Sequence, residues 1–203
     1  MSRSRLLMVA MAVALVAPTA HAGVPSASQS YVDPCLRICP SGDMNFHVVV
    51  RDASANPIAN STVSIALCPC RSIVLCPLNG NERYAITGCD IVAVTNAAGI
   101  VDIQLRGGGT CNGPVQVFAD GIPLSTLGGV SSPDQDGNAS VDVIDQTILA
   151  AKFPGPDPTG DFNCSAGLDP GDQLIQNSHL GHSCAVVVPN RSTTWGRIKT
   201  IYR

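Results

Sequence analysis

Oxygen-bearing side chains recur at a fixed spacing in two short segments of this 203-residue chain. The segments run from Asp134 to Asp145 and from Asp161 to Asp172, and they start 27 residues apart. Each carries Asp, Asn or Ser at its first, third, fifth, ninth and twelfth positions. These residues are Asp134, Asp136, Asn138, Asp142 and Asp145, then Asp161, Asn163, Ser165, Asp169 and Asp172. A hard cation such as Ca²⁺ takes six to eight oxygen ligands, and a twelve-residue loop supplies them at this spacing.

The seventh positions, Ser140 and Gly167, complete the candidate ligand sets, because loops of this type use a main-chain carbonyl there. The predicted chemistry is therefore the binding of two calcium ions. Ser165 is a neutral ligand, so we expect the second site to bind calcium more weakly. Ala139 and Ala166 occupy the sixth position, where glycine usually makes the sharp turn. The alternative interpretation is a pair of acidic surface turns that bind no ion.

The paired loops resemble the dockerin family of tandem loop-helix calcium modules, which often close the loop with Asp in place of Glu. The resemblance covers residues 132–182. Apolar residues at helical spacing follow each loop, namely Val143, Ile144, Ile148, Leu149 and Phe153 after the first and Leu174, Ile175 and Leu180 after the second. We expect two short helices that bury these faces against each other and a module whose folding depends on calcium. The resemblance implies a cohesin-like protein as partner.

Alternating apolar and polar residues predict β-strands between Phe46 and Leu127. Val63, Ile65 and Leu67 alternate with polar or small neighbours, and the segment from Val101 to Arg106 repeats the pattern. Turn signals separate these runs, as in Asn56-Pro57 and Asn96-Ala97-Ala98-Gly99. Several short strands divided by turns favour an antiparallel β-sandwich.

Three segments carry a second resemblance: VVVRDASANPIANSTVSI from Val48, VTNAAGIVDIQL from Val94 and VQVFADG from Val115. They resemble bacterial immunoglobulin-like domains, including the group-1 type of surface adhesins. The expected fold is thus mainly β, an immunoglobulin-like sandwich followed by a dockerin-like pair of loop-helix motifs. The predicted divisions are an irregular Cys-containing leader at 23–43, a sandwich at 44–130, a calcium module at 131–184 and a tail at 185–203.

Residues 1–22 are typical of a secretory signal peptide, with basic Arg3 and Arg5, an apolar stretch from Leu6 to Ala17 and a small-x-small site at Ala20-His21-Ala22. We therefore expect an extracellular or cell-surface protein. The apolar stretch is too short for a membrane span, and no later segment reaches about 18–20 apolar residues. The formal net charge is −3, and no basic face indicates nucleic-acid binding. The basic tail with the single Trp is interpreted either as a sorting tag or as an element packed on the body.

Nine cysteines follow the signal segment, and in an exported chain they are expected to form disulfides. An odd number leaves one thiol free or paired with another molecule. Cys164 and Cys184 are the two in the expected calcium module, and their pairing is one possibility. Zinc binding by Cys68, Cys70 and Cys76 is disfavoured because no second pair lies at zinc-finger spacing.

No catalytic constellation is evident, so a non-enzyme is expected. GxSxG, HExxH and phosphate-binding glycine motifs are missing. His179 and His182 form an H-x-x-H pair, for which interaction with a helix dipole is favoured over a metal role. The run Gly107-Gly108-Gly109 is interpreted as a flexible loop.

Three functions remain open. The first is a secreted, non-catalytic calcium-binding protein for attachment or assembly, with a cohesin-like partner or another copy of itself. The second is a structural subunit of an extracellular filament or surface layer, which the odd cysteine and free sheet edges would favour. The third is an accessory component of polysaccharide binding or degradation, which only the dockerin association favours.

Overall fold

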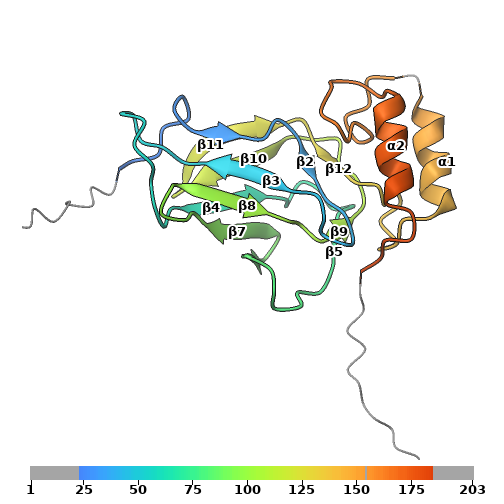
Figure 1. The fold of residues 1–203 in the computed structure, drawn as a ribbon, viewed down its shortest axis with the longest axis horizontal. Helices are drawn as coiled ribbons and strands as arrows, with labels where there is room; N and C mark the ends of the chain where they lie inside the picture. Colours follow the sequence, from blue (N-terminus) through green and yellow to red (C-terminus); the bar gives the residue numbers. More distant parts are fainter. Residues whose placement is uncertain (1–22, 154, 185–203) are drawn as a thin grey trace, which may run out of the picture.

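The computed structural model describes residues 23–153 and 155–184 (Figure 1). The expected signal segment at 1–22 and the tail at 185–203 lie outside the described residues. Within them the protein is mainly β, with antiparallel sheets in a sandwich-like arrangement and two short helices beside one end of the sheets (Figure 1). None of the described helices has the length and apolar character needed to cross a membrane.

The larger sheet has five antiparallel strands in the order β11-β10-β4-β7-β6. Its strands are β4 (Thr62–Ala66), β6 (Tyr84–Thr87), β7 (Asp90–Val94), β10 (Val115–Ala119) and β11 (Ile122–Leu127). Val63 pairs with Ala93 on one side and Ala119 on the other, and all three are buried. The period-two prediction for Val63 and Ile65 is confirmed, because both face the core.

The smaller antiparallel sheet has the order β1-β3-β8, with β1 at Tyr31–Val32, β3 at Phe46–Val49 and β8 at Ile100–Ile103. Phe46 lies opposite Ile103, and Val48 lies opposite Val101. These four side chains belong to the same buried cluster as Val63, Ile65 and Val117 of the larger sheet. The two sheets therefore share one core.

Two further strand pairs lie near the helices: β2 (Leu36–Arg37) runs parallel to β12 (Val130–Ser131), and β5 (Val74–Leu75) pairs with β9 (Gly107–Gly108). Strands β1 and β2 fall inside the segment 23–43 that the sequence marks as irregular. The expectation of a flexible glycine loop is wrong, because Gly107, Gly108 and Gly109 are buried. Their bare backbone lets other chain segments approach closely, which a side chain would prevent.

The helices α1 (Val143–Lys152) and α2 (Pro170–Ser178) begin with the same capping box. Asp142 and Asp145 form it in α1, and Asp169 and Asp172 form it in α2. In each box the N-cap carboxylate accepts a bond from the first helical turn while the second acid bonds back to the N-cap N–H.

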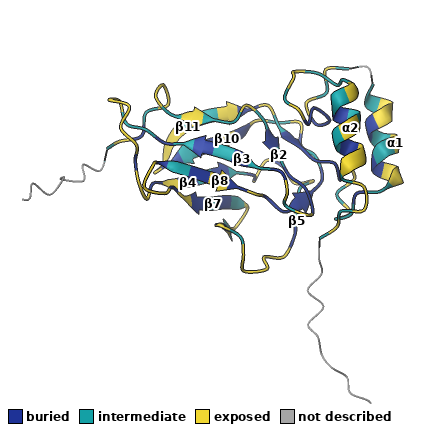
Figure 2. Cartoon of the chain, in the orientation of Figure 1, coloured by how far each residue is buried: buried dark blue, intermediate teal, exposed yellow. Residues whose placement is uncertain are grey.

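The helices do not bury their apolar faces only against each other, contrary to expectation. Leu149 packs in a cluster with Phe162 and with Cys39 and Met44 from the N-terminal segment. Val143 and Ile144 are 69% and 52% exposed, and Leu174 is 70% exposed. Both helices carry exposed as well as buried stretches (Figure 2). The packing of the helices therefore involves the N-terminal segment of the protein.

Four disulfides are present, as is typical of proteins that fold in an oxidising compartment. Cys68–Cys89 and Cys70–Cys111 lie within the β region, whereas Cys35–Cys164 and Cys76–Cys184 connect it to the helical region. The pairing of Cys164 with Cys184 is thus wrong. The chain after α2 runs back beside the first loop, where the Cys184 N–H donates to Ala139 O, and from there it reaches Cys76. Cys39 is the free cysteine, and it is buried.

Candidate metal-binding loops

The two acidic loops share one hydrogen-bond pattern around their closing residues. Asp145 accepts main-chain bonds from Gln135 (2.7 Å), Asp136 (3.2 Å) and Asp142 (2.8 Å). Its counterpart Asp172 accepts bonds from the equivalent N–H groups, which belong to Phe162, Asn163 and Asp169 (2.7, 3.1 and 2.9 Å). Both carboxylates are fully buried. Each loop is therefore closed by the carboxylate at its twelfth position.

The first-position carboxylates are held from the other side of each loop. Asp134 accepts bonds from the Asn138 and Ala139 N–H groups at 3.1 and 2.8 Å. Asp161 accepts bonds from the N–H groups of Ser165 and Ala166 at 3.0 and 2.8 Å. The two loops thus curl around their first carboxylate in the same way.

The sixth residue of each loop adopts the left-handed conformation that glycine usually fills. Ala139 and Ala166 both have φ of 70°. The fourth residues are also left-handed, with φ of 72° at Gly137 and 61° at Cys164. The loop path is therefore kept without glycine at position six, at a conformational cost of about 1–2 kcal/mol per alanine.

Each loop also bonds to the chain that follows the opposite helix. The Val141 N–H donates to His182 O at 2.8 Å, and the Leu168 N–H donates to Gly155 O at 3.3 Å. Both pairs are related by the 27-residue repeat. The repeat in the sequence therefore corresponds to a repeated arrangement in space.

In the first loop the structure brings together three of the predicted side-chain ligands. Asp134, Asp136 and Asp145 offer oxygens that all lie within 4.8 Å of one another. Asn138 lies beside them, and its Nδ2 donates to Asp136 Oδ2 at 3.0 Å. Asp142 serves as the N-cap of α1 and is not part of this group of three.

In the second loop the polar side chains contact one another directly. Asn163 and Ser165 both donate to the Asp169 carboxylate, at 3.1 and 3.2 Å. Ser165 Oγ also lies 3.1 Å from Gly167 O, so its single proton is shared between that carbonyl and Asp169. The pKa of Asp169 is lowered by its hydrogen bonds, first that from the Gly171 N–H and then that from Asn163.

Burial and mutual repulsion make the first loop strongly electronegative. The pKa of Asp134 is raised to about 6, chiefly by burial and also by the nearby Asp145 carboxylate, against the lowering effect of its backbone hydrogen bonds. Burial also raises the pKa of Asp145. A cation beside these buried carboxyl groups would stabilise their ionised form, because its charge offsets their mutual repulsion and the hydration that they lose on burial.

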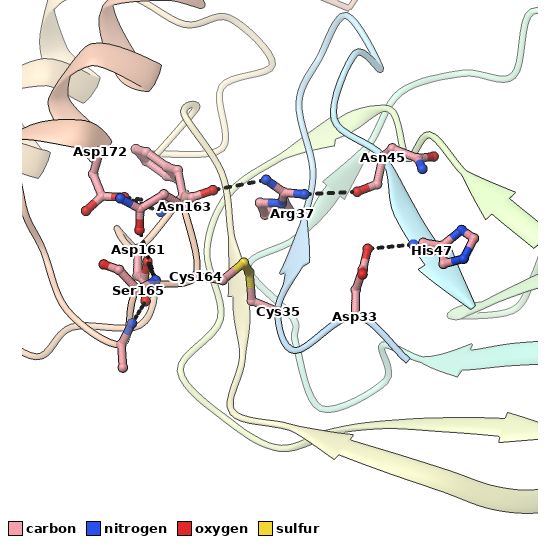
Figure 3. The surroundings of a disulfide bond; sticks show 12 residues. Asp33, Cys35, Arg37, Asn45, His47, Asp161, Asn163, Cys164, Ser165 and Asp172 are labelled. Carbon is pink, nitrogen blue, oxygen red and sulfur yellow. Dashed lines mark hydrogen bonds between the residues drawn. A yellow bond between two sulfur atoms is a disulfide. The ribbon is translucent and has the colours of Figure 1, made fainter. Parts of the chain in front are cut away.

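Each loop is anchored on the β region at its fourth position. Gly137 of the first loop packs on Gly109. A Cβ added at position 137 would lie 3.2 Å from the Gly109 Cα. Cys164 of the second loop forms the disulfide with Cys35 (Figure 3). Beside that disulfide, Arg37 donates to Phe162 O and Asn45 O at 3.2 and 3.3 Å. Neither Arg37 nor the glycine run stands out in the sequence as part of this site, because their role depends on contacts between distant segments.

Four carboxylates and one histidine of the β region take part in local contacts. Asp52 accepts the N–H groups of Ser54 and Asn56, and Asp120 accepts the Thr62 N–H, so both stabilise turns. His47 Nδ1 lies 2.7 Å from Asp102 Oδ1 on the outer face of the smaller sheet. Glu82 pairs with Arg106 at 3.2 Å. Arg106 is buried, although the alternating pattern of residues 101–106 places it on the polar face of the strand.

Comparison with known proteins gives no further assignment, because no family model matches the chain and no curated protein sequence matches it either.

Proposed function

We propose that this is a secreted, non-catalytic protein that binds two calcium ions and uses its C-terminal module for extracellular attachment or assembly. The observation that supports this most is the hydrogen-bond pattern shared by the two loops. Two surface turns with no common role would not be expected to repeat closing carboxylates, left-handed sixth residues and cross-helix bonds at matching positions.

The donor chemistry of the loops fits calcium. Asp134, Asp136, Asn138 and Asp145, with the Ser140 carbonyl, would hold the first ion, and Asp142 would contribute through water as the ninth position often does. In the second loop Asp161, Asn163, Ser165 and Asp172, with the Gly167 carbonyl, would hold the ion, and Asp169 would contribute through water as Asp142 does. All these donors are oxygens, the ligands that a hard cation prefers. The first loop has one more carboxylate, so its site is the tighter one.

The module is proposed to be dockerin-like and the sandwich immunoglobulin-like, which suits display of a calcium-dependent binding surface. The exposed aliphatic side chains of Val143, Ile144 and Leu174 support a protein partner, since apolar surface of this kind is often covered in a complex. A cohesin-like protein is the first candidate partner.

A filament or surface-layer subunit is the second candidate function. The edge strands β11 and β6 of the larger sheet favour it, because strand addition at such edges would allow polymerisation. Polymerisation through an intermolecular disulfide is not favoured, because the free Cys39 is fully buried.

A polysaccharide-binding role is the third candidate function. It is favoured by a cavity of about 420 Å³ whose lining includes Glu82, Arg83, Asp102 and Arg106.

Titration calorimetry on the decalcified protein tests the central proposal. Two calcium ions should bind per chain, the first more tightly. Less than one ion per chain would refute it. Size-exclusion chromatography with calcium and with chelator then separates the first two functions, because a filament subunit should self-associate. A screen against polysaccharides and generic esters tests the third, and turnover would contradict the non-catalytic assignment.

A further inference from the structure

A second group of potential metal ligands lies outside the acidic loops. It joins Cys39 and Asp43, which follow β2, to His179 and His182 at the C-terminal end of α2. One donor atom from each residue lies within 4.8 Å of the others. The residues come from segments about 140 positions apart, so the chain fold itself assembles them.

Three of the distances between donor atoms are those expected around a tetrahedral ion. Cys39 Sγ lies 3.6 Å from His182 Nδ1. Asp43 Oδ2 lies 3.4 Å from His179 Nε2 and 3.5 Å from His182 Nδ1. A tetrahedral Zn²⁺ with ordinary bonds to sulfur, nitrogen and oxygen separates its ligand atoms by roughly 3.3–3.6 Å.

The surrounding contacts orient two of the donors toward a common point. His179 Nδ1 lies 2.7 Å from Ile175 O, so it carries the proton and leaves the Nε2 lone pair facing Asp43. Metal-binding histidines usually donate their second ring N–H in this way. Ser41 Oγ donates to Asp43 Oδ1 at 2.7 Å, which leaves Oδ2 directed at the two histidines. Ser41 Oγ also lies 2.9 Å from His182 Nδ1 and 3.2 Å from Cys39 Sγ, so an ion bound to Nδ1 and Sγ would replace these two contacts.

Cys39 is chemically distinct from the other cysteines of the protein. The other eight form disulfides, whereas Cys39 is fully buried and unpaired. Burial raises the pKa of its thiol to about 12 in the absence of a cation. A bound divalent metal would stabilise the thiolate at neutral pH. The same metal would protect the thiol from oxidation.

We propose that Cys39, Asp43, His179 and His182 form a structural transition-metal site, with Zn²⁺ as the natural occupant, separate from the two acidic loops. One thiolate, two imidazoles and one carboxylate suit zinc and not calcium, which prefers oxygen alone. The ion would clamp the segment after β2 to the end of α2, next to the Cys76–Cys184 disulfide. This proposal does not depend on calcium occupying the loops.

The test uses the full oxidised protein with saturating calcium, so that the acidic loops are occupied. Zn²⁺ titration by calorimetry should show one further site per chain. Co²⁺ in its place should give intense visible bands of a tetrahedral ion and a near-ultraviolet thiolate-to-cobalt band. Absence of added Zn²⁺ binding, or a cobalt spectrum lacking the thiolate band, would overturn the proposal.

Variants identify the ligands. Cys39→Ser and His182→Gln should each weaken Zn²⁺ binding by at least about 100-fold. This is more than the loss of affinity expected when a residue that only hydrogen-bonds to a metal ligand is removed. His47→Gln is the matched control, because His47 also lies beside a carboxylate but on the smaller sheet, and it should leave binding unchanged. The His182 side chain is 31% exposed, so His182→Gln should keep the fold even if Cys39→Ser, at a fully buried position, does not. Unchanged binding in His182→Gln would exclude this site.

Discussion

Asp134, the first residue of the first acidic loop, lies directly against the bare backbone of Gly108. A Cβ at position 108 would overlap the Asp134 carboxylate, and the Gly109 N–H donates to Asp134 O at 2.7 Å. The carboxylate is therefore fixed by the sandwich as well as by its own loop. Calcium binding at the first loop and the integrity of strand β9 should depend on each other.

Gly108→Ala should displace Asp134 and weaken the first calcium site. The added methyl group has no space, and forced overpacking typically costs about 1–3 kcal/mol. Calorimetry should show the tighter site weakened by about tenfold or more while the second site is kept. Gly128→Ala is the control, because a Cβ there meets no atom within 4 Å. Equal calcium affinity in both variants would show that this contact does not position the ligand.

Asp145→Asn should remove the first site alone, and Asp172→Asn the second alone. Each carboxylate accepts three main-chain bonds through its two oxygens, and an amide group would place an N–H₂ against one of these donors. We expect the stoichiometry in calorimetry to fall from two to one, with stability lowered by about 1–3 kcal/mol. A variant that still binds two ions would show that the loop assignment is incorrect.

Local patterns predicted the strands, and a short helix after each loop, because these elements depend on neighbouring residues. Alternation placed Ile65 and Ile103 in the core, and Asn96 forms the expected turn by accepting the N–H groups of Ala98 and Ile100. The acidic loops were recognisable because their oxygen-bearing side chains recur at a fixed spacing within twelve residues.

Long-range contacts were not predictable from such patterns. Helical spacing put Val143 and Leu174 on buried faces, yet both are exposed because Cys39 and Met44 cover a different part of the helical region. The partners of Cys164 and Cys184 likewise depend on where β2 and β5 end in space. Nothing in the sequence near Gly108 indicates that a carboxylate 26 residues later packs on it.

Acid should weaken calcium binding at the first loop while stabilising the calcium-free protein. The pKa of Asp134 is raised from 3.8 to about 6, so the folded protein binds this proton more tightly than the unfolded chain does. Stability of the calcium-free protein should thus rise as the pH falls from 7.5 to 5. Calcium competes with the proton, and its affinity should fall by about tenfold over the same range.

Thermal denaturation and calorimetry at the two pH values measure both effects. Asp134→Asn should remove the contribution of this group to the pH dependence of calcium-free stability. Calcium affinity that is equal at pH 7.5 and pH 5 would contradict the prediction, because it would mean that the first-loop carboxylates titrate normally.

Ala139→Gly and Ala166→Gly should each stabilise the protein. Both alanines have φ of 70°, a region that costs a residue with a Cβ about 1–2 kcal/mol and glycine much less. The gain is partly offset because glycine has a more flexible unfolded state, so we expect a net gain of up to about 1 kcal/mol. Chemical denaturation measures it. Ala98→Gly, in an exposed turn without positive φ, should instead lose stability.

Chelation of calcium should loosen the helical region while the sheets persist. The helices depend on capping carboxylates that belong to the acidic loops, whereas the core of Val63, Ile65 and Val117 lies in the sandwich. Hydrogen exchange with chelator should show lost protection in α1 and α2 and retained protection in β4, β7 and β10. The disulfides Cys35–Cys164 and Cys76–Cys184 should keep the loosened region attached and allow rapid recovery when calcium is restored.

The double variant Cys35→Ser/Cys164→Ser should make that recovery slower and the calcium-loaded protein less stable, by about 2–4 kcal/mol for the loss of one disulfide. Cys68→Ser/Cys89→Ser is the matched control, because its disulfide joins residues of the β region only. It should lower the stability of the sheets and leave helix recovery unchanged. Simultaneous loss of protection in helices and sheets under chelator would instead show a single cooperative unit that calcium holds together as a whole.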